Sequence, residues 1–161
     1  MLKYNVWTHT VKGGYLMASI CGADCANCGM NKTCRGCIET AGHPFGGECI
    51  AAKCYENGGK PCFDAYKAQL IEAFNTLCIP DMPKVTELYL LAGSYINLEY
   101  TFPGGAKARL LDDTKVYLGG QLEKPDSDRC FGFAADDTCL FVCEYGCNGN
   151  DPELVIYKRR N

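Results

Sequence analysis

The alternation of apolar and polar residues changes twice along the chain and divides it into three regions. Residues 19–62 show little apolar periodicity, residues 63–78 repeat apolar side chains with the period of a helix, and the chain from residue 84 alternates with the period of a strand. We therefore predict an α+β fold. It consists of an N-terminal cysteine-rich, metal-stapled knuckle module (19–62), an amphipathic helix with a proline linker (63–83), and a C-terminal antiparallel β-meander (84–161).

The segment FDAYKAQLIEAFNTLC is predicted to form the amphipathic helix, which ends before Pro80 and Pro83. A shorter helix is predicted just before it, from about Glu48 to Asn57, with Gly58 and Gly59 as its left-handed C-cap. The buried face of the longer helix consists of Tyr66, Leu70, Ala73, Phe74 and Leu77.

Strict alternation in SYINLEYTF predicts a strand over residues 95–102, followed by a three-residue loop that sets Tyr100 opposite Ala108. Further strands are predicted at residues 114–120, 129–135, 138–146 and 153–160, which gives a meander of five or six strands. If Asp136 and Asp137 form the two-residue turn between two of these strands, Cys130 lies opposite Cys143.

Cysteine is the outlier of the composition, with 13 residues in 161, of which eight lie between Cys21 and Cys62. A spacing of two residues lets both sulfurs face one ion about 2.3 Å away, so CANC and CRGC are natural half-sites for zinc. Together they supply Cys25, Cys28, Cys34 and Cys37. Cys21 is then spare, and either replaces one of the four or serves a second site.

A second, incomplete metal site is predicted from Cys49, Cys54 and Cys62, with Cys21 or His43 as its fourth ligand. Cys130, Cys139 and Cys143 lie on predicted strands, where the expected role is that of small buried thiols. If Cys130 lies opposite Cys143, the two are also close enough for a disulfide or for shared ligation of a metal. The predicted metal ligands are therefore Cys21, Cys25, Cys28, Cys34, Cys37, Cys49, Cys54 and Cys62.

Zinc is the predicted metal, and four thiolates around it leave no open position, so we expect a structural site rather than an enzyme. An iron–sulfur cluster that serves an electron carrier or enzyme would use the same thiolates. Disulfides are a third interpretation, and a thiol-based redox or metal sensor that uses the spare cysteines is a fourth. The first residues lack an apolar segment behind basic residues, so we predict a cytoplasmic protein.

The net charge of −3 and the pI near 5.4 argue against binding to nucleic acid, because bound thiolates would add further negative charge. No apolar run reaches 18 residues, so no membrane span is predicted. The expected partner is a protein or small molecule that the sequence does not identify. Lys12-Gly13-Gly14 is what an in-frame ribosome-binding sequence would encode, so residues 1–18 are predicted to be a leader, with natural translation starting at Met17.

Three segments, ICGADCANC, CRGC and GHPFGGECIAAKC, together with the following Cys62, resemble a family of bacterial proteins, the domain of unknown function numbered 3795. The resemblance covers about residues 19–70 and implies a cysteine-rich protein that binds zinc and has no established activity. The chain departs from the family pattern at Leu70, where a further cysteine is expected, and this departure concerns the second metal site.

Overall fold

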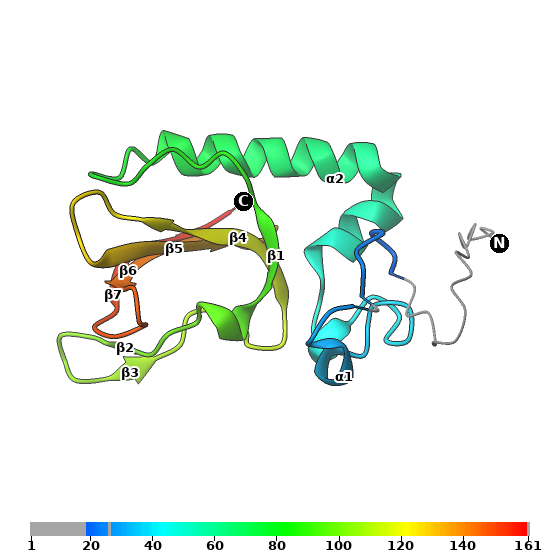
Figure 1. The fold of residues 1–161 in the computed structure, drawn as a ribbon, viewed down its shortest axis with the longest axis horizontal. Helices are drawn as coiled ribbons and strands as arrows, with labels where there is room; N and C mark the ends of the chain where they lie inside the picture. Colours follow the sequence, from blue (N-terminus) through cyan, green and yellow to red (C-terminus); the bar gives the residue numbers. More distant parts are fainter. Residues whose placement is uncertain (1–18, 26, 161) are drawn as a thin grey trace.

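A long bent helix, α2 (Ile50–Thr76), joins a loop-rich cysteine module to an antiparallel sheet (Figure 1). This arrangement comes from a computed structural model, which describes residues 19–25 and 27–160; the predicted leader lies outside these ranges. The module contains the single-turn helix α1 (Asn31–Cys34) and the 3₁₀ turn η1 (Pro44–Gly46). The predicted α+β class is therefore confirmed.

The sheet has five strands in the order β1-β4-β5-β6-β7, and each strand is antiparallel to its neighbours. The strands predicted after residue 113 all form, so the predicted meander is confirmed. A separate two-stranded hairpin consists of β2 (Tyr100–Thr101) and β3 (Lys107–Ala108). The sheet strands are β1 (Tyr89–Ala92), β4 (Val116–Glu123), β5 (Arg129–Ala135), β6 (Cys139–Gly146) and β7 (Glu153–Arg159).

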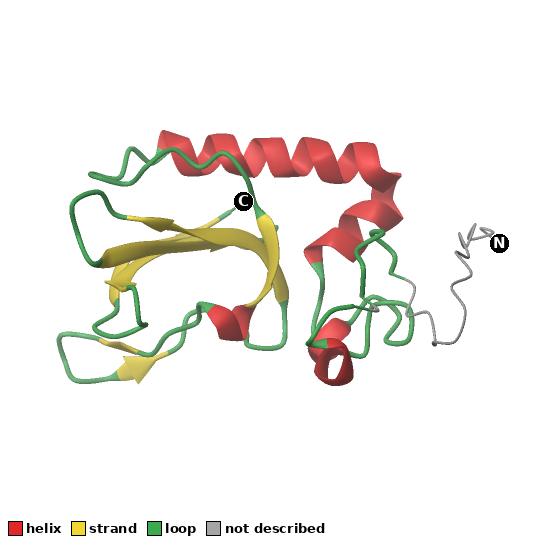
Figure 2. Ribbon diagram, in the orientation of Figure 1, coloured by secondary structure: helices red, strands yellow, loops and turns green. Residues whose placement is uncertain are grey.

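Each face of the sheet is covered by a different part of the chain (Figure 2). The apolar stripe of α2 packs on one face, where the rings of Phe74 and Phe133 meet edge to face with centroids 5.1 Å apart. The segment between β1 and β4, which includes the 3₁₀ turn η2 (Gly93–Tyr95), packs on the other, where Tyr100 contacts Phe141. None of the helices in the described ranges is long and apolar enough to cross a bilayer.

The two predicted helices are the two arms of α2, which bends at Gly58 and Gly59. Gly59 has a φ of 66° and a ψ of −158°, a conformation that residues with a side chain avoid. A Cβ at Gly58 would lie 2.8 Å from the Cβ of Cys62, so the bend also needs a residue without a side chain there. The paired glycines therefore set the direction in which the long arm leaves the module.

The strand predicted at residues 95–102 is wrong over most of its length, because only Tyr100 and Thr101 pair, with β3. The cause is Asn97, a side chain only 2 % exposed. Its Oδ1 accepts hydrogen bonds from the backbone N–H groups of Leu110 and Leu111, both at 2.9 Å, and this fixes an irregular loop instead of a ladder. The predicted three-residue hairpin loop is confirmed, since Tyr100 lies opposite Ala108.

The predicted turn at Asp136 and Asp137 is wrong by one residue. Asp136 still pairs with Cys139 through its backbone N–H, 3.1 Å from the carbonyl oxygen of Cys139. Its carboxylate accepts a further hydrogen bond from the backbone N–H of Thr138 at 2.8 Å, so the turn moves one position along the chain. As a result Gly132, not Cys130, lies opposite Cys143.

Candidate metal centre

The loop after α1 turns the chain so that Cys34 and Cys37 lie close together. Arg35 and Gly36 adopt left-handed backbone conformations, with φ of 62° and 69°. In this tight turn the backbone N–H of Gly36 donates to the Sγ of Cys34, 3.3 Å away. The backbone N–H of Ile20 donates to the Sγ of Cys37 at 2.9 Å. Amides aimed at sulfur stabilise the thiolate form, which is the form that binds metals.

Three other thiols of the module, Cys21, Cys34 and Cys37, lie within electrostatic range of Cys25. Burial raises the pKa of Cys25, and the neighbouring Cys37, Cys21 and Cys34 raise it further. Burial also raises the pKa of Cys37, against the opposing effect of the amide of Ile20. Deprotonation of Cys25 and Cys37 is therefore favoured when a bound cation compensates the negative charge.

The sulfurs of this group do not form a closed cage. Within residues 19–25 and 27–160, no set of three or more histidine, cysteine, aspartate or glutamate side chains is arranged closely enough to hold a metal ion. Cys28, which the spacing places in the CANC half-site, has an exposed side chain and is not among the thiols that raise the pKa of Cys25. The thiols themselves are the donor type that thiophilic metals prefer.

Cys49, Cys54 and Cys62 divide into two groups. Cys49 is buried at the start of α2, where burial, with smaller contributions from Cys21 and Cys37, raises its pKa to about 11. Burial also raises the pKa of Cys54 to about 11, and Cys62 contributes by its proximity and a hydrogen bond between the side chains. Cys54 and Cys62 therefore face each other across the bend of α2, whereas Cys49 lies within electrostatic range of Cys21 and Cys37.

The remaining predicted ligand, His43, is exposed at the start of η1. The later cysteines have different environments. Cys130 forms a disulfide with Cys147, a pairing that the sequence analysis does not anticipate. Cys139 and Cys143 are buried in the sheet, as predicted, and burial raises the pKa of each thiol to about 11. Cys78 is exposed after the end of α2.

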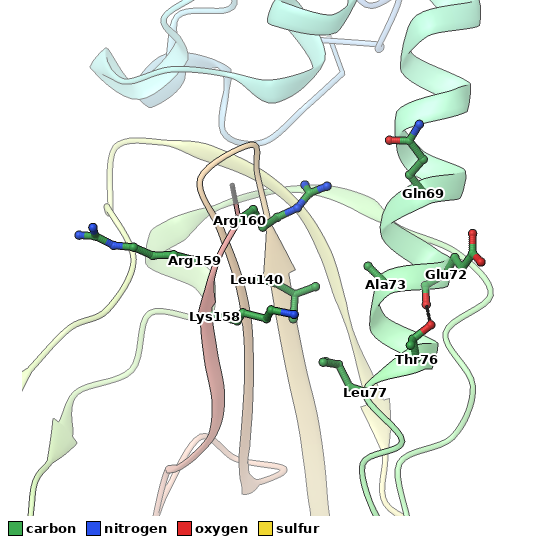
Figure 3. Close-up of a pocket in the computed structure, with 9 residues that line it drawn as sticks. All are labelled: Gln69, Glu72, Ala73, Thr76, Leu77, Leu140, Lys158, Arg159 and Arg160. Atoms are coloured by element: carbon green, nitrogen blue, oxygen red, sulfur yellow. Dashed lines mark hydrogen bonds between the residues drawn. The ribbon is translucent and has the colours of Figure 1, made fainter.

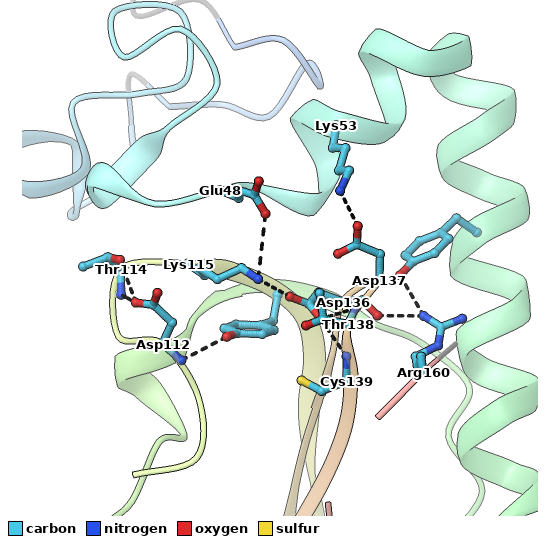
Figure 4. A network of polar contacts seen from close by, with 12 residues as sticks. Glu48, Lys53, Asp112, Thr114, Lys115, Asp136, Asp137, Thr138, Cys139 and Arg160 are labelled. Carbon is cyan, nitrogen blue, oxygen red and sulfur yellow. Dashed lines mark hydrogen bonds and ion pairs between the residues drawn. The ribbon is translucent and has the colours of Figure 1, made fainter. Parts of the chain in front are cut away.

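A polar network connects the module to the sheet (Figure 4). Lys115 lies 2.5 Å from the Oδ2 of Asp136 and 3.9 Å from a carboxylate oxygen of Glu48, and both Lys115 and Asp136 are largely buried. Lys53 at the start of α2 pairs with Asp137. The backbone carbonyl of Glu48 also accepts a hydrogen bond from the N–H of Val116, at 2.8 Å.

This network holds the chain next to Cys49 against the first residues of β4, so the position of that thiol depends on the sheet. The sequence analysis assigned Asp136 and Asp137 to a turn and gave Lys115 no role. The sequence features that indicate such a network are the acidic pair at the hairpin turn and the two lysines, Lys53 and Lys115. Which lysine pairs with which aspartate depends on the tertiary structure.

No family model matches the chain, and no curated protein or solved structure is similar to it. The resemblance to the domain of unknown function numbered 3795 therefore stays a prediction.

Proposed function

We propose that residues 19–49 form a structural zinc module, in which Cys21, Cys25, Cys34 and Cys37 are the ligands. The observation that supports this most directly is the gathering of these four thiols, two of which accept hydrogen bonds from backbone amides. When bound, zinc would take them as thiolates and cross-link loops that bury little apolar surface. Four thiolates leave no coordination position for water or substrate, which favours a structural role over catalysis.

The backbone of the module positions the proposed zinc ligands. The left-handed turn at Arg35 and Gly36 holds Cys34 and Cys37 as one pair, while the Ile20 amide brings the segment of Cys21 and Cys25 next to it. The open arrangement of the sulfurs means that binding must draw the two segments together. Cys28 points to solvent and is not required for this step.

The proposal includes a reducing, cytoplasmic location and a protein partner. Free thiols dominate the chain, since 11 of the 13 cysteines are unpaired, and this is typical of proteins kept in reducing compartments. The Cys130–Cys147 disulfide is the feature that argues against this location.

The test is elemental analysis, with an absorption spectrum, of protein purified without oxygen or added metal. We expect about one zinc ion per chain and no visible absorption. Cys21→Ser should lose the zinc, whereas the matched variant Cys28→Ser should retain it. Stoichiometric iron with visible absorption would replace the zinc proposal with the iron–sulfur alternative, and a metal-free protein with oxidised thiols would reject both.

A further inference from the structure

A groove of about 650 Å³ lies between the second half of α2 and the margin of the sheet at β6 and β7 (Figure 3). Its apolar part consists of Ala73 and Leu77 on the helix and Leu140 on β6. Ala73 and Leu77 are half-buried, so part of their apolar surface faces the groove. Such a trough fits an elongated ligand with apolar side chains better than a compact one.

The rim of the groove carries a positive charge in a chain that is negative overall. Lys158, Arg159 and Arg160 line it at the end of β7, and Glu72 is the acidic residue on the opposite wall. Figure 3 shows the side chains of Lys158 and Arg160 on the side of the sheet that faces α2, with Arg159 directed away from the helix. The groove therefore complements an anionic ligand.

Two of these three cations have no partner in the described part of the chain. Arg160 is engaged, since its Nη1 donates to the hydroxyl of Tyr66 at 2.8 Å and to the backbone carbonyl of Asp136 at 2.7 Å. The side chains of Lys158 and Arg159 form no hydrogen bond or ion pair with the described residues and are exposed. They are therefore available to the carboxylates of a ligand.

The backbone of β7 offers a second set of contacts. β7 is the last strand of the sheet, so one of its edges has no neighbour. The N–H of Arg160 points inward, since it donates to the carbonyl of Thr138 at 2.9 Å. Because backbone groups alternate along an antiparallel strand, the N–H and C=O groups of Tyr157 and Arg159 point outward. A bulge at residue 155 leaves this C-terminal part of β7 as the regular portion of the edge.

We propose that the groove binds an extended acidic segment of a partner protein, which adds as a short strand to the free edge of β7. The segment forms backbone hydrogen bonds with Tyr157 and Arg159. Its carboxylates pair with Lys158 and Arg159, and an apolar side chain rests on Ala73 and Leu77. Backbone pairing supplies affinity in this mode, and the alternate side chains supply the preference for acidic sequences. This inference does not depend on the metal module, which lies at the other end of α2.

The test uses a short fluorescent peptide that repeats Glu-Glu-Val-Glu, so that in an extended chain glutamate alternates with valine on the face toward the groove and glutamates occupy the other face. Binding is followed by fluorescence anisotropy. We expect saturable binding to the wild-type protein and about tenfold weaker binding to Lys158→Glu, because one charge-assisted contact is replaced by repulsion. Lys32→Glu, an exposed substitution in the distant module, should bind as the wild type does. Circular dichroism confirms that both variants keep the wild-type fold.

Two further kinds of peptide test the proposed strand addition without altering the protein. The same sequence with lysine in place of glutamate should not bind. Two N-methylated peptides complete the set, one methylated at the odd-numbered amides and the other at the even-numbered amides. Only one row of N–H groups faces β7, so one of the two peptides should lose binding and the other should keep it. Equal binding of the acidic and basic peptides, no effect of Lys158→Glu, or no effect of N-methylation in either peptide would overturn the proposal.

Discussion

Cysteine has opposite roles in the two halves of this molecule. In the sheet, Cys139 and Cys143 lie among aromatic side chains as small buried thiols, and the sheet would have a core without them. In the module, Cys34 and Cys37 are themselves among the buried residues, and few apolar side chains surround them. The surroundings of a cysteine, rather than its presence, therefore indicate whether it packs a core or substitutes for one.

This contrast implies that the two halves owe their stability to different interactions. The faces of the sheet are covered by α2 and by the segment between β1 and β4, so hydrophobic burial stabilises it. The module lacks such cover and, under the proposal above, depends on a metal cross-link. Experiments that remove either the metal or the hydrophobic contacts should therefore destabilise one half and leave the other intact.

The largest expected effect is the loss of structure in the module when the metal is removed. After treatment of the reduced protein with a chelator, trypsin should cut rapidly at Lys32 and Arg35, which are exposed in and after α1. Lys124 and Arg129 should stay resistant, because their side chains pair with Glu144 on the sheet. Mass spectrometry of the fragments identifies the sites. Equal cleavage before and after chelation, or simultaneous cleavage in the sheet, would show that the halves are not stabilised separately.

The second largest expected effect is the loss of stability of the sheet in the variant Phe133→Ala. Phe133 is buried on β5 and packs against Phe74 of α2, so its removal leaves a cavity that costs about 4 kcal/mol. Urea denaturation followed by circular dichroism measures the loss. The control is Tyr89→Ala, since Tyr89 is 62 % exposed and its removal should change little. The zinc content per folded chain should be the same in Phe133→Ala as in the wild type. A lower zinc content would show that the module depends on the core of the sheet.

Cys147→Ser tests the one disulfide of the sheet and should cost about 3 kcal/mol, because the bond closes a loop between residues 17 positions apart. The difference from the wild type should disappear when both proteins are unfolded under strong reductant. A difference that persists in the reductant would mean that the cysteine contributes through its contacts rather than through the bond.

The sequence predicted the parts of the fold that depend on local periodicity. The four strands from β4 to β7 and the apolar face around Leu70 and Phe74 follow from alternation with periods of two and 3.6. The bend at Gly58 and Gly59 was also predicted, as a boundary between two helices, because paired glycines favour left-handed conformations.

The remaining features depend on contacts between distant residues. The loop at residues 95–102 has the pattern of a strand, and only the burial of Asn97 against Leu110 and Leu111 explains its irregular path. A shift of one residue in the β5–β6 turn was enough to change the residue opposite Cys143. The spacing of the first cysteines indicated a metal site, but the orientation of Cys28 toward solvent is a property of the folded loop.

The smallest effect expected is that of Asp136→Asn, which tests the buried ion pair with Lys115 next to the contact between the two halves. Burial alone would raise the pKa of Asp136, but Lys115 and the hydrogen bonds from Thr138 and Cys139 outweigh it and lower the pKa. A lowered pKa in the folded state means that the ionised carboxylate stabilises the protein above the pKa of the unfolded chain, about 4, and that this contribution is lost as the pH falls further.

We therefore expect Asp136→Asn to cost about 2 kcal/mol at neutral pH, because it removes the nearer of the two carboxylates beside the largely buried Lys115 and leaves Glu48 at 3.9 Å, while keeping the oxygen that accepts the turn hydrogen bonds. The difference from the wild type should shrink as the pH falls below about 4 and disappear below the lowered pKa of Asp136 in the folded wild type, where that carboxylate is protonated as well. The matched control, Asp137→Asn, removes a more exposed pair with Lys53 and should cost under about 1 kcal/mol. Urea titrations across pH give both values. A loss at Asp136 that stays constant down to low pH would show that the charge in the ion pair with Lys115 is not the source of the effect.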